Sequence, residues 1–474
     1  MSTPLDVTTV TPADLSAAVA TLRARVAGAV LLPDSEGYAE EVASFNAATT
    51  HRPSVVVAAR STDDVAAAVR FAAGLGLPVA VQATGHGADD AITGGVLVST
   101  KQLTGVAVDP RERTATLAAG TRWKAVIEAA AAHGLAPLNG SSSDVGAIGY
   151  TAGGGLPVLG RTFGFAADHV RRMTVVTADG EVREVSAETE TDLFWGLRGG
   201  KGNLAIVTEM TVDLVPVSRL YGGGIFYAAE HTATVLHAYR DWAAALDEST
   251  TTAISLLRMP PIPEIPEPLR GRFVVHLCVA HVGSAADGER IVAPMRAAAP
   301  AIIDTLAEMP YTQVDRIFED PDHPVPVYEH CVLLAELTDA AIAALLAAAG
   351  PDVSVPVMLL ELRQLGGALS RPPAVANAVG ARDAAFLVGV IGVLMPPVAQ
   401  AVPAAVDAVV AAMAPYATGG TFVNFHGCAG DAADRARAWP APVYERLREL
   451  KRRYDPTDVF CFGHAIRAAD TASA

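Results

Sequence analysis

Cysteine is scarce in this chain of 474 residues, which has only four. They are Cys278, Cys331, Cys428 and Cys461, and no two of them have the CxxC spacing of a zinc or iron–sulfur site, so we expect no metal centre. So few cysteines also exclude a disulfide framework, and they are typical of a reducing, cytoplasmic compartment. Because none precedes Cys278, no thiol chemistry is available to the N-terminal half of the chain.

Positive charge is scarce as well. Lys and Arg number 35 against 51 Asp and Glu, for a formal net charge of −16. Nucleic-acid binding needs clustered Lys and Arg, and no basic run occurs, so we expect no nucleic-acid partner. No uncharged apolar run reaches the roughly 18 residues of a membrane span. Met1–Thr11 is polar and contains Asp6, so we also expect no signal peptide.

Hydrophobic residues, in contrast, make up 51% of the chain, enough for two or three domains with a large core. A helical pattern covers residues 12–28, and Val55–Ala58 is predicted to be a strand. The next helix opens at Ser61, with an acidic residue three positions later, which is a capping-box spacing. The apolar run Leu77–Val81 then predicts a second strand, so a strand, a helix and a strand lead into a glycine turn.

That turn, Gln82–Asp89, has the sequence QATGHGAD and organises the rest of the chain. Glycines on both sides of His86 allow a tight turn and a close approach to a ligand. Successive N–H groups in such a turn form an anion-binding nest that suits a pyrophosphate, with the imidazole held beside it. The alternative is a strand-ending turn that merely contains a histidine.

Two more glycine-rich segments follow. Residues 139–155 are too long and too rich in glycine and serine for a simple turn, and they suit a backbone that wraps a flat or anionic ligand. They match neither GxGxxG nor GxxxxGK[ST], and the alternative is an irregular connector. The third segment, Gly199–Asn203, leads into a predicted strand at 204–208.

The pattern changes near Pro216, where longer strands begin to alternate with longer helices. Strands are predicted at 223–228, 253–258, 273–281, 357–363, 386–394 and 421–426, and helices at 340–348 and 402–414. This pattern predicts an antiparallel sheet backed by helices, an α+β arrangement. A charged helix, 443–454, follows near the end of the chain.

These pieces together resemble the berberine bridge enzyme-like branch of the vanillyl-alcohol oxidase and p-cresol methylhydroxylase superfamily of flavoproteins, in its bacterial, single-histidine-linked form. The matching pieces are Gly85-His86-Gly87, Asp144-Val145-Gly146, Gly149–Gly155, Leu197–Asn203, Val207-Thr208, Phe422–Phe425, Tyr444–Leu447 and Leu450–Pro456 with Phe460. Each piece is weak alone, but their order and spacing agree over nearly the whole chain.

The resemblance implies an α+β protein with a two-part FAD-binding domain and a substrate domain. The FAD domain would comprise residues 1–215 and a C-terminal segment, 429–474, and the substrate domain residues 216–428. The resemblance also implies that His86 is joined covalently to FAD. The other residues implied to bind FAD are Gln82, Ala83, Thr84, Gly85, Gly87, Ala88, Ser141, Ser142, Val145, Gly146, Gly149, Tyr150, Gly153, Gly154, Gly155, Gly202, Asn203, Ile206, Val207, Asn424 and His464.

The chain departs from the family pattern at three places. Many members have a second covalent link through a cysteine at the position of Ser142, so this sequence predicts a single attachment. Many members carry tyrosine at Phe422, and often at Phe425, which makes a tyrosine-based mechanism there doubtful. The family's GGGHS turn is Ala-Thr-Gly-His-Gly here, so a serine hydroxyl is missing.

Candidate catalytic residues lie on the predicted substrate sheet and beside it. Strand alternation puts Glu361 and Arg363 on one face, as a base with its partner or clamp, or as a plain ion pair. On the predicted strand 421–426, Phe422, Asn424 and His426 share one face. His426 is a candidate base, with a structural histidine as the alternative. Tyr150 can offer its hydroxyl to cofactor or substrate.

We therefore expect an FAD-dependent oxidase or dehydrogenase that removes hydride from a small organic substrate, with secondary metabolism as its setting and molecular oxygen as a candidate acceptor. Two alternatives remain. One is a redox-neutral cyclase or pericyclase on the same fold, suggested by Phe422 and Phe425. The other is a flavin-containing protein that only binds a small molecule. The sequence does not predict the oligomeric state.

Overall fold

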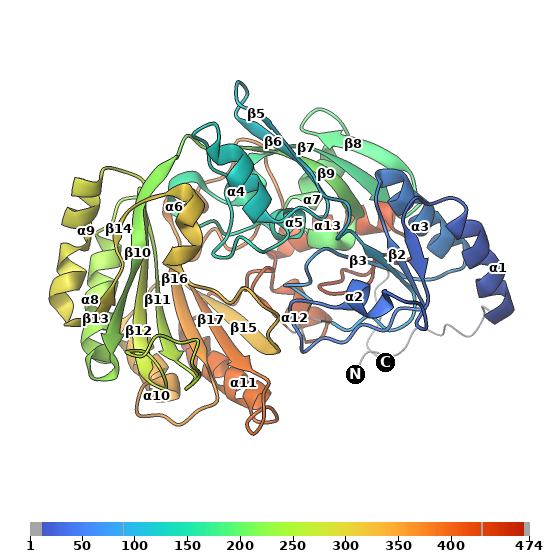
Figure 1. Ribbon diagram of the computed structural model, residues 1–474. Helices are drawn as coiled ribbons and strands as arrows, with labels where there is room; N and C mark the ends of the chain where they lie inside the picture. The colour runs from blue at the N-terminus through green and yellow to red at the C-terminus, as the bar shows by residue number, and fades with distance from the viewer. Residues whose placement is uncertain (1–11, 89, 428–429, 469–474) are drawn as a thin grey trace.

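The computed structural model describes residues 12–88, 90–427 and 430–468. Asp89 of the first glycine turn, the residues at the expected 428/429 domain boundary and the Met1–Thr11 segment lie outside this range. The described chain forms three sheets flanked by helices, and the largest sheet lies at one end of the molecule (Figure 1). The structure is an α+β fold of the kind that the sequence predicts.

The first sheet carries the His86 turn. Its spatial order is β1 (Ala29–Leu31), β2 (Val55–Ala58), β4 (Val96–Ser99) and β3 (Val79–Gln82). β4 pairs in parallel with β2 and with β3, and β2 and β4 are buried throughout, as parallel strands covered on both faces require. The helices around this sheet are α1 (Pro12–Arg23), α2 (Tyr38–Val42) and α3 (Thr62–Gly74). α1 ends five residues before the predicted helix does, ahead of Gly28 and β1.

The second sheet is antiparallel. Its spatial order is β5 (Val106–Asp109), β6 (Thr114–Ala118), β9 (Ala205–Asp213), β7 (Val170–Thr177) and β8 (Val182–Ser186). Its helices are α4 (Trp123–Ala131), α5 (Ala147–Ala152), α6 (Gly160–Phe163) and α7 (Thr191–Leu197). The second glycine segment, for which the sequence predicts no helix, contains one short helix, α5, whose apolar residues Ala147 and Ile148 are buried in the core.

The third and largest sheet comes from residues 219–393. Its spatial order is β13 (Ala301–Asp304), β10 (Arg219–Ala228), β12 (Phe273–His281), β11 (Thr250–Arg258), β16 (Leu359–Gln364), β17 (Phe386–Val393) and β15 (Val327–Leu334), and β14 (Ala307–Pro310) also pairs with β10. Every pairing is antiparallel. One face packs on α8 (Thr232–Ala244), α9 (Ala285–Ala298), α10 (Asp339–Ala349) and α11 (Val402–Met413) in a single hydrophobic cluster.

The opposite face of this sheet is turned toward the first half of the chain. A short 3-10 segment, η4 (Tyr311–Ile317), joins the core of the second sheet through Tyr311 and Val314. The Tyr311 hydroxyl donates to Asn139 Oδ1 at 2.7 Å, within the second glycine segment. The large sheet and the glycine segments therefore share an interface.

One predicted strand is wrong. Thr421–His426 forms turns, in which the Phe425 N–H donates to Phe422 O at 2.8 Å. The segment pairs with no strand of the three sheets, so its side chains do not alternate between two sheet faces. The expectation that Phe422, Asn424 and His426 share one strand face is therefore also wrong.

The C-terminal part returns to the first two sheets. α13 (Ala441–Tyr454) follows the short α12 (Ala432–Ala436) and buries Leu447 and Leu450 in the core that contains α7. Lys451 and Asp455 form a fully buried ion pair at 2.6 Å. Val459 O then accepts from the Val79 N–H at 2.7 Å, which places the tail beside β3. Among the described residues, no helix combines the length and the apolar character that crossing a membrane requires.

Candidate active site

The turn after β3 is shaped by one glycine. Gly85 has φ +74°, a left-handed conformation that costs glycine little. A Cβ built on Gly85 would lie 2.7 Å from the Ser44 Cβ, so a larger residue would also clash. The chain therefore presents His86 from a turn that only glycine fits well.

The side chain of Gln82 stabilises this turn. Its Oε1 contacts His51 Nε2 at 3.0 Å and accepts from Ser44 Oγ at 3.3 Å, and its amide donates to Ala43 O at 3.1 Å. The Ile92 N–H donates to His51 Nδ1, so the His51 proton is on Nε2 and points at Gln82. Gln82 therefore holds the turn in place. Each of these side-chain contacts of Gln82 is made with another residue of the protein.

The His86 imidazole is held on two sides. The Phe45 ring stacks on it with centroids 3.7 Å apart and an interplanar angle of 12°. Its Nδ1 contacts Thr84 Oγ1 at 2.8 Å, whereas its Nε2 is buried and has no hydrogen-bond partner among the described residues. Burial, with a smaller contribution from Arg122, lowers the pKa of His86 to about 4. At neutral pH the site therefore presents an uncharged imidazole with one uncommitted nitrogen.

The second glycine segment lies against this turn. The Gly146 N–H donates to Thr84 Oγ1 at 3.4 Å, and a Cβ built on Gly146 would lie 3.3 Å from the Ala83 Cβ. Val145 packs at the edge of the core, and Gly149 faces open space. Two segments about 60 residues apart in sequence therefore form one surface beside His86.

Asn424 joins the C-terminal part to that surface. Its Nδ2 donates to Tyr150 O at 3.0 Å, and its Oδ1 accepts from the Gly155 N–H at 3.4 Å. A Cβ built on Gly153 would lie 2.6 Å from Asn424 Oδ1, so this approach requires glycine. Gly154 and Gly155 both have positive φ, which closes the segment around the amide.

Tyr150 lies at the centre of the second glycine segment. Its ring meets Trp123 edge-on with centroids 5.6 Å apart, and a Cβ built on Gly155 would overlap the Tyr150 ring at 2.4 Å. The hydroxyl is buried and has no hydrogen-bond partner among the described residues. Burial raises the pKa of Tyr150 well above its usual value, so the phenol stays protonated and can donate to a ligand.

Glu361 and Arg363 lie on the inward face of β16. Arg363 Nε donates to Glu361 Oε2 at 2.5 Å, and Arg363 Nη2 donates to Ser141 Oγ at 3.2 Å. The guanidinium also lies 4.7 Å from the Phe318 ring centroid and 4.9 Å from that of Phe425. Burial raises the pKa of Glu361, and Arg363 opposes that rise. A small cavity lined by Arg363, Phe318, Leu156 and others lies beside this pair.

The third glycine turn connects to the tail. Asn203 Nδ2 donates to His464 O at 3.0 Å, and Asn203 Oδ1 accepts from the Ile466 N–H at 2.8 Å. Gly202 faces open space. Ile206 and Val207, in contrast, have their side chains in two hydrophobic cores, which leaves only their backbone for contact with a ligand.

The serine at the expected cysteine position makes a local contact. Ser142 Oγ accepts from the Asp144 N–H at 3.3 Å. Its neighbour Ser143 is tied to the substrate side, because Asp315 on η4 accepts from both the Ser143 N–H, at 2.9 Å, and Ser143 Oγ. These two hydrogen bonds hold the second glycine segment against η4.

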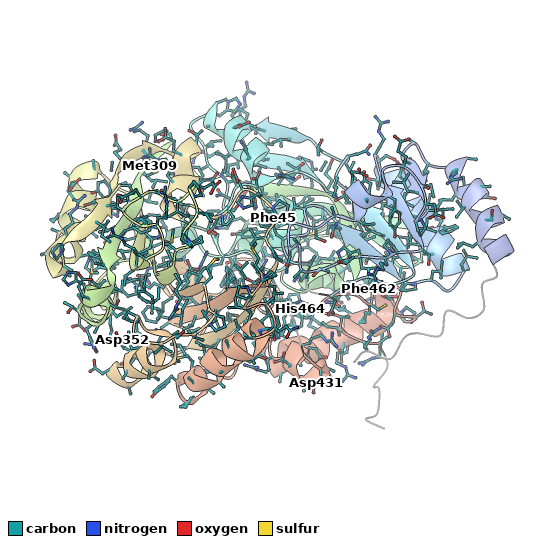
Figure 2. The ribbon with its side chains drawn as sticks, turned by 60° about the horizontal axis from the view of Figure 1, so that its bottom comes forward. Phe45, Met309, Asp352, Asp431, Phe462 and His464 are labelled. Carbon is teal, nitrogen blue, oxygen red and sulfur yellow. The ribbon has the colours of Figure 1, made fainter. Side chains whose placement is uncertain are left out.

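Several residues of the site are not predicted from the sequence, because each acts on a segment far away in the chain: Ser44, Phe45, His51 and Asp315. Phe45 precedes His86 by 41 positions and has no motif around it. Figure 2 shows Phe45 and His464 near the middle of the molecule, between its two halves, whereas Met309 and Asp352 lie toward the end that holds the large sheet. Only the folded chain identifies these partners.

The arrangement fits FAD on two observations. A buried imidazole nitrogen and a buried phenol hydroxyl, those of His86 and Tyr150, lack partners among the described residues. Glycines at 85, 146 and 153 keep the surface around them free of side chains. Over the described ranges, no three His, Cys, Asp or Glu side chains come together as they would around a metal ion.

Comparison with known proteins agrees with this fit. A family model described as "FAD binding domain" matches residues 53–186, and one described as "Berberine and berberine like" matches residues 435–467. An (R)-6-hydroxynicotine oxidase of Paenarthrobacter nicotinovorans is 28% identical over 298 residues, 61% of this chain and 62% of that enzyme. The aligned part therefore spans less than two thirds of that relative.

Two solved structures have the same fold. A 6-hydroxy-D-nicotine oxidase from Arthrobacter nicotinovorans superposes with a TM-score of 0.80 at 23% identity, covering 94% of this chain and 98% of that one. A glucooligosaccharide oxidase from Acremonium strictum, described with a 6-S-cysteinyl, 8α-N1-histidyl FAD, superposes with a TM-score of 0.83 at 21% identity, covering 96% of this chain and 99% of that one. At these identities the likeness establishes the architecture.

Proposed function

We propose that this chain is an FAD-dependent oxidoreductase of the berberine bridge enzyme-like branch of the vanillyl-alcohol oxidase superfamily, with FAD attached covalently through His86 alone. The observation that carries the proposal is the uncommitted, buried Nε2 of a neutral imidazole, set among glycine segments.

His86 is prepared to act as a nucleophile. If Nδ1 donates its proton to Thr84 Oγ1, the lone pair of the ring lies on Nε2, the nitrogen without a partner. A neutral imidazole is a competent nucleophile toward an electrophilic ring methyl group, and stacking on Phe45 fixes its direction. Ser142 has no thiol to offer, and a hydroxyl is a far weaker nucleophile than a thiolate, so the account requires one bond only.

When bound, FAD would accept a hydride from the substrate. The protein would then take a proton from the neighbouring hydroxyl or amine, and Glu361 is the base that we assign to this step. Its buried carboxylate has a raised pKa, which makes it a stronger base than an exposed one. Arg363, held between Phe318 and Phe425, orients Glu361 and a polar substrate group. Tyr150, whose buried hydroxyl has no hydrogen-bond partner among the described residues, would donate a hydrogen bond to the substrate or the cofactor.

The substrate would be a small organic molecule bound between the large sheet and residues 139–155, and oxygen is the acceptor that we propose. We place the reaction in secondary metabolism and in the cytoplasm, with no nucleic-acid or membrane partner. The division into an FAD domain (1–215 and 429–474) and a substrate domain (216–428) is part of the same proposal.

An anaerobic titration tests the activity. The purified protein is mixed with a panel of alcohols, amines, sugars and phenols, and the flavin absorption is followed near 450 nm. Bleaching by at least one compound, reversed by air, is expected. A protein that contains FAD, can be photoreduced, and yet is bleached by no compound that it binds would contradict the oxidoreductase assignment.

A redox-neutral cyclase on the same fold is the second candidate, and one observation favours it. Phe422, where many family members carry a tyrosine, is buried and packs on Phe165 with ring centroids 5.5 Å apart, so that position offers no phenol as a base. Product formation under anaerobic conditions with the flavin still oxidised would support this candidate.

A further inference from the structure

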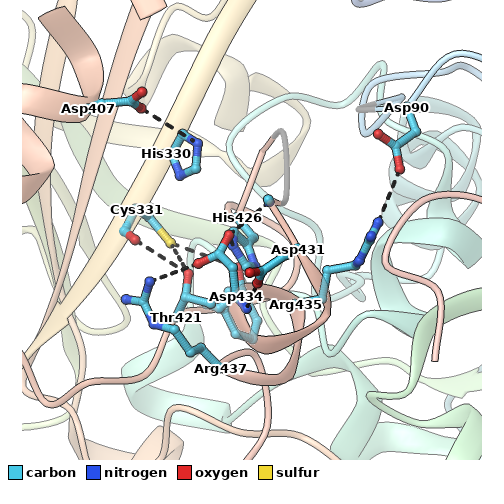
Figure 3. Close-up of polar contacts among 12 residues, drawn as sticks. Asp90, His330, Cys331, Asp407, Thr421, His426, Asp431, Asp434, Arg435 and Arg437 are labelled. Carbon is cyan, nitrogen blue, oxygen red and sulfur yellow. Dashed lines mark hydrogen bonds and ion pairs between the residues drawn. The ribbon is translucent and has the colours of Figure 1, made fainter. Parts of the chain in front are cut away.

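A buried carboxylate–imidazole pair lies outside the groups used above. His426 is 1% exposed, and its Nε2 lies 2.9 Å from Asp434 Oδ2 on α12 (Figure 3). Asp434 also accepts from the Gly430 N–H at 2.9 Å and from Arg437 Nη1 at 2.9 Å. Burial alone would raise the pKa of Asp434, but hydrogen bonds from Gly430 and His426 hold it below its usual value. The aspartate is therefore an acceptor, so Nε2 of His426 carries the ring proton.

That assignment fixes the state of the other nitrogen. With the proton on Nε2, the lone pair of His426 lies on Nδ1, which is buried and has no hydrogen-bond partner among the described residues. Burial lowers the pKa of His426, so the ring is neutral near pH 7. An unpartnered acceptor in the interior costs free energy, and such a group is retained more readily where it receives a proton or a ligand.

A second imidazole lies next to it. The His464 and His426 ring centroids are 5.0 Å apart. Lys201 Nζ lies 3.3 Å from His464 Nδ1, and because an ammonium group can only donate, His464 accepts at Nδ1 and carries its proton on Nε2. Burial, and then Lys201, lowers the pKa of His464 well below its usual value. His464 thus has its donor on Nε2, and His426 has its acceptor on Nδ1. These two atoms are not hydrogen-bonded to each other in this structure, so a proton passes between them only when one ring turns toward the other.

The two ends of this series lie in different surroundings. Lys201 Nζ is 3.8 Å from the position of a Cβ on Gly87, within the turn that carries His86. Asp434 is about a quarter exposed, at the surface. Among the described residues, other charged or titratable groups near the pair include His330 on β15, with its ring 6.0 Å from His426, and Arg435 and Arg437 beside Asp434. Asp90 lies 3.6 Å from Arg435. His330 in turn lies 3.8 Å from Asp407 (Figure 3).

We propose that Lys201, His464, His426 and Asp434 form a proton relay between the His86 turn and the surface. In the outward direction, Lys201 passes a proton to His464 Nδ1, His464 releases its Nε2 proton to His426 Nδ1, and His426 releases its Nε2 proton to Asp434, which gives it to water. Each histidine gains one proton and loses one, Lys201 regains its proton from the group that releases one in the proposed flavin chemistry, and rotation or tautomer exchange of the rings restores the starting state. Proton uptake follows the same path in reverse. The function of the relay rests on the proposed flavin chemistry. The tautomers assigned to His426 and His464 do not depend on that chemistry.

Nitrogen-15 NMR of histidine-labelled protein at pH 7.5, in the full chain as purified, tests the tautomers without any activity. The relay requires neutral His426 with its proton on Nε2, and His464 with its proton on Nε2. Asp434→Asn should abolish the fixed Nε2–H state of His426, whereas His323→Gln, at an exposed position, should leave both signals unchanged. A cationic His426, or one with the proton on Nδ1, would overturn the relay even in a protein that proves to be a flavoenzyme.

Laser-flash reduction of the bound flavin, with proton uptake followed by an indicator dye, tests the transfer. His426→Gln keeps a polar side chain but cannot relay, and it should slow proton uptake at least about 10-fold, within the range of general acid–base effects. The His323→Gln control should match the unmodified protein, and the flavin spectrum of both variants should be unchanged. Uptake at the original rate in His426→Gln would overturn the relay and leave the oxidoreductase assignment intact.

Discussion

The Phe45 ring lies flat on the His86 imidazole, with centroids 3.7 Å apart. Phe45 is itself fixed by its backbone, because its N–H donates to Thr84 O at 2.9 Å and the next N–H, that of Asn46, donates to Gly85 O. The segment that carries the stacked ring is therefore bonded to the same turn that carries the imidazole. This contact fixes the direction in which Nε2 points.

Replacing Phe45 by Leu should slow covalent attachment of FAD about 2- to 10-fold, because an aromatic pair contributes about 0.5–1.5 kcal/mol beyond its buried area. The measurement is the time course of acid-stable, protein-bound flavin after FAD is added to the apoprotein. Phe71→Leu, at a half-buried position in the same part of the fold, is the control. Equal time courses in both variants would mean that the stack does not direct attachment.

Two glycines with similar φ angles allow the cost of backbone strain to be measured separately from the cost of crowding. Gly85 and Gly94 have φ of +74° and +71°, but a Cβ on Gly85 meets Ser44 at 2.7 Å, whereas nothing lies within 4 Å of a Cβ on Gly94. Gly94→Ala should lower the free energy of unfolding by about 1–2 kcal/mol through the left-handed backbone. Gly85→Ala should cost about 1–3 kcal/mol more through overpacking. Urea unfolding of both variants measures the difference, and equal losses would contradict the crowding.

Replacing Glu361 by Gln removes the proposed base and changes the shape of the side chain little. Flavin reduction by a bleaching substrate should slow about 10²- to 10⁴-fold. Stopped-flow absorption measures this rate, and the oxidised flavin spectrum should not change. Glu308→Gln, which alters an exposed ion pair with Arg219, is the control. An unchanged reduction rate in Glu361→Gln would move the base to another residue.

Stability should fall in acid because several buried histidines stay neutral in the folded protein. The pKa is lowered for His51, His86, His276, His281, His426 and His464. Below pH 6.5 the histidines of the unfolded chain take up protons, whereas those of the folded chain do not. The free energy of unfolding therefore decreases as the pH falls, and each histidine stops contributing once the pH is below its pKa in the folded protein, which is about 4 for His86 and about 3 for His276.

His276 offers a direct test of this slope. It stacks on Phe226 with centroids 3.9 Å apart, so His276→Phe keeps an aromatic ring and removes the titration. The slope of unfolding free energy between pH 6 and pH 4.5 should fall by up to about 1.4 kcal/mol per pH unit. Denaturant unfolding at several pH values measures it, with His323→Gln as the exposed control. An unchanged slope would mean that His276 is protonated in the fold.

Much of the fold could be predicted from the sequence because its signals are local. The β3 strand, the Ser61 cap of α3 and the glycine turn each follow from residues within a few positions of one another. The hydrophobic runs of the large sheet also predicted β10, β11, β12, β16 and β17, but not β13, β14 or β15. Thr421–His426 did not form a strand, because this segment has no neighbouring strand among the described residues to pair with. The alternation of apolar and polar residues predicts a strand reliably only where the segment has a neighbouring strand to pair with.

The site could be predicted only in part. Glu361 and Arg363 are two positions apart on a strand, so their contact follows from period-two geometry. Phe45, Asp315 and Asp434, which contact other residues of the site, come from loops and short helices. No local sequence pattern predicts these contacts. Ile206 and Val207 were expected at the cofactor, but their side chains lie in hydrophobic cores, since a β-strand motif does not say which of its atoms face a ligand.

The central claim is that one bond, made by His86 and no other residue, holds FAD to the chain. Intact mass spectrometry of the denatured protein measures this directly, with His86→Ala as the comparison. The account predicts the mass of the chain plus one FAD for the unmodified protein, and the mass of the bare chain with FAD released into solution for His86→Ala. A bare-chain mass for the unmodified protein, with free FAD in the supernatant, would contradict the claim, and so would FAD that remains attached in His86→Ala.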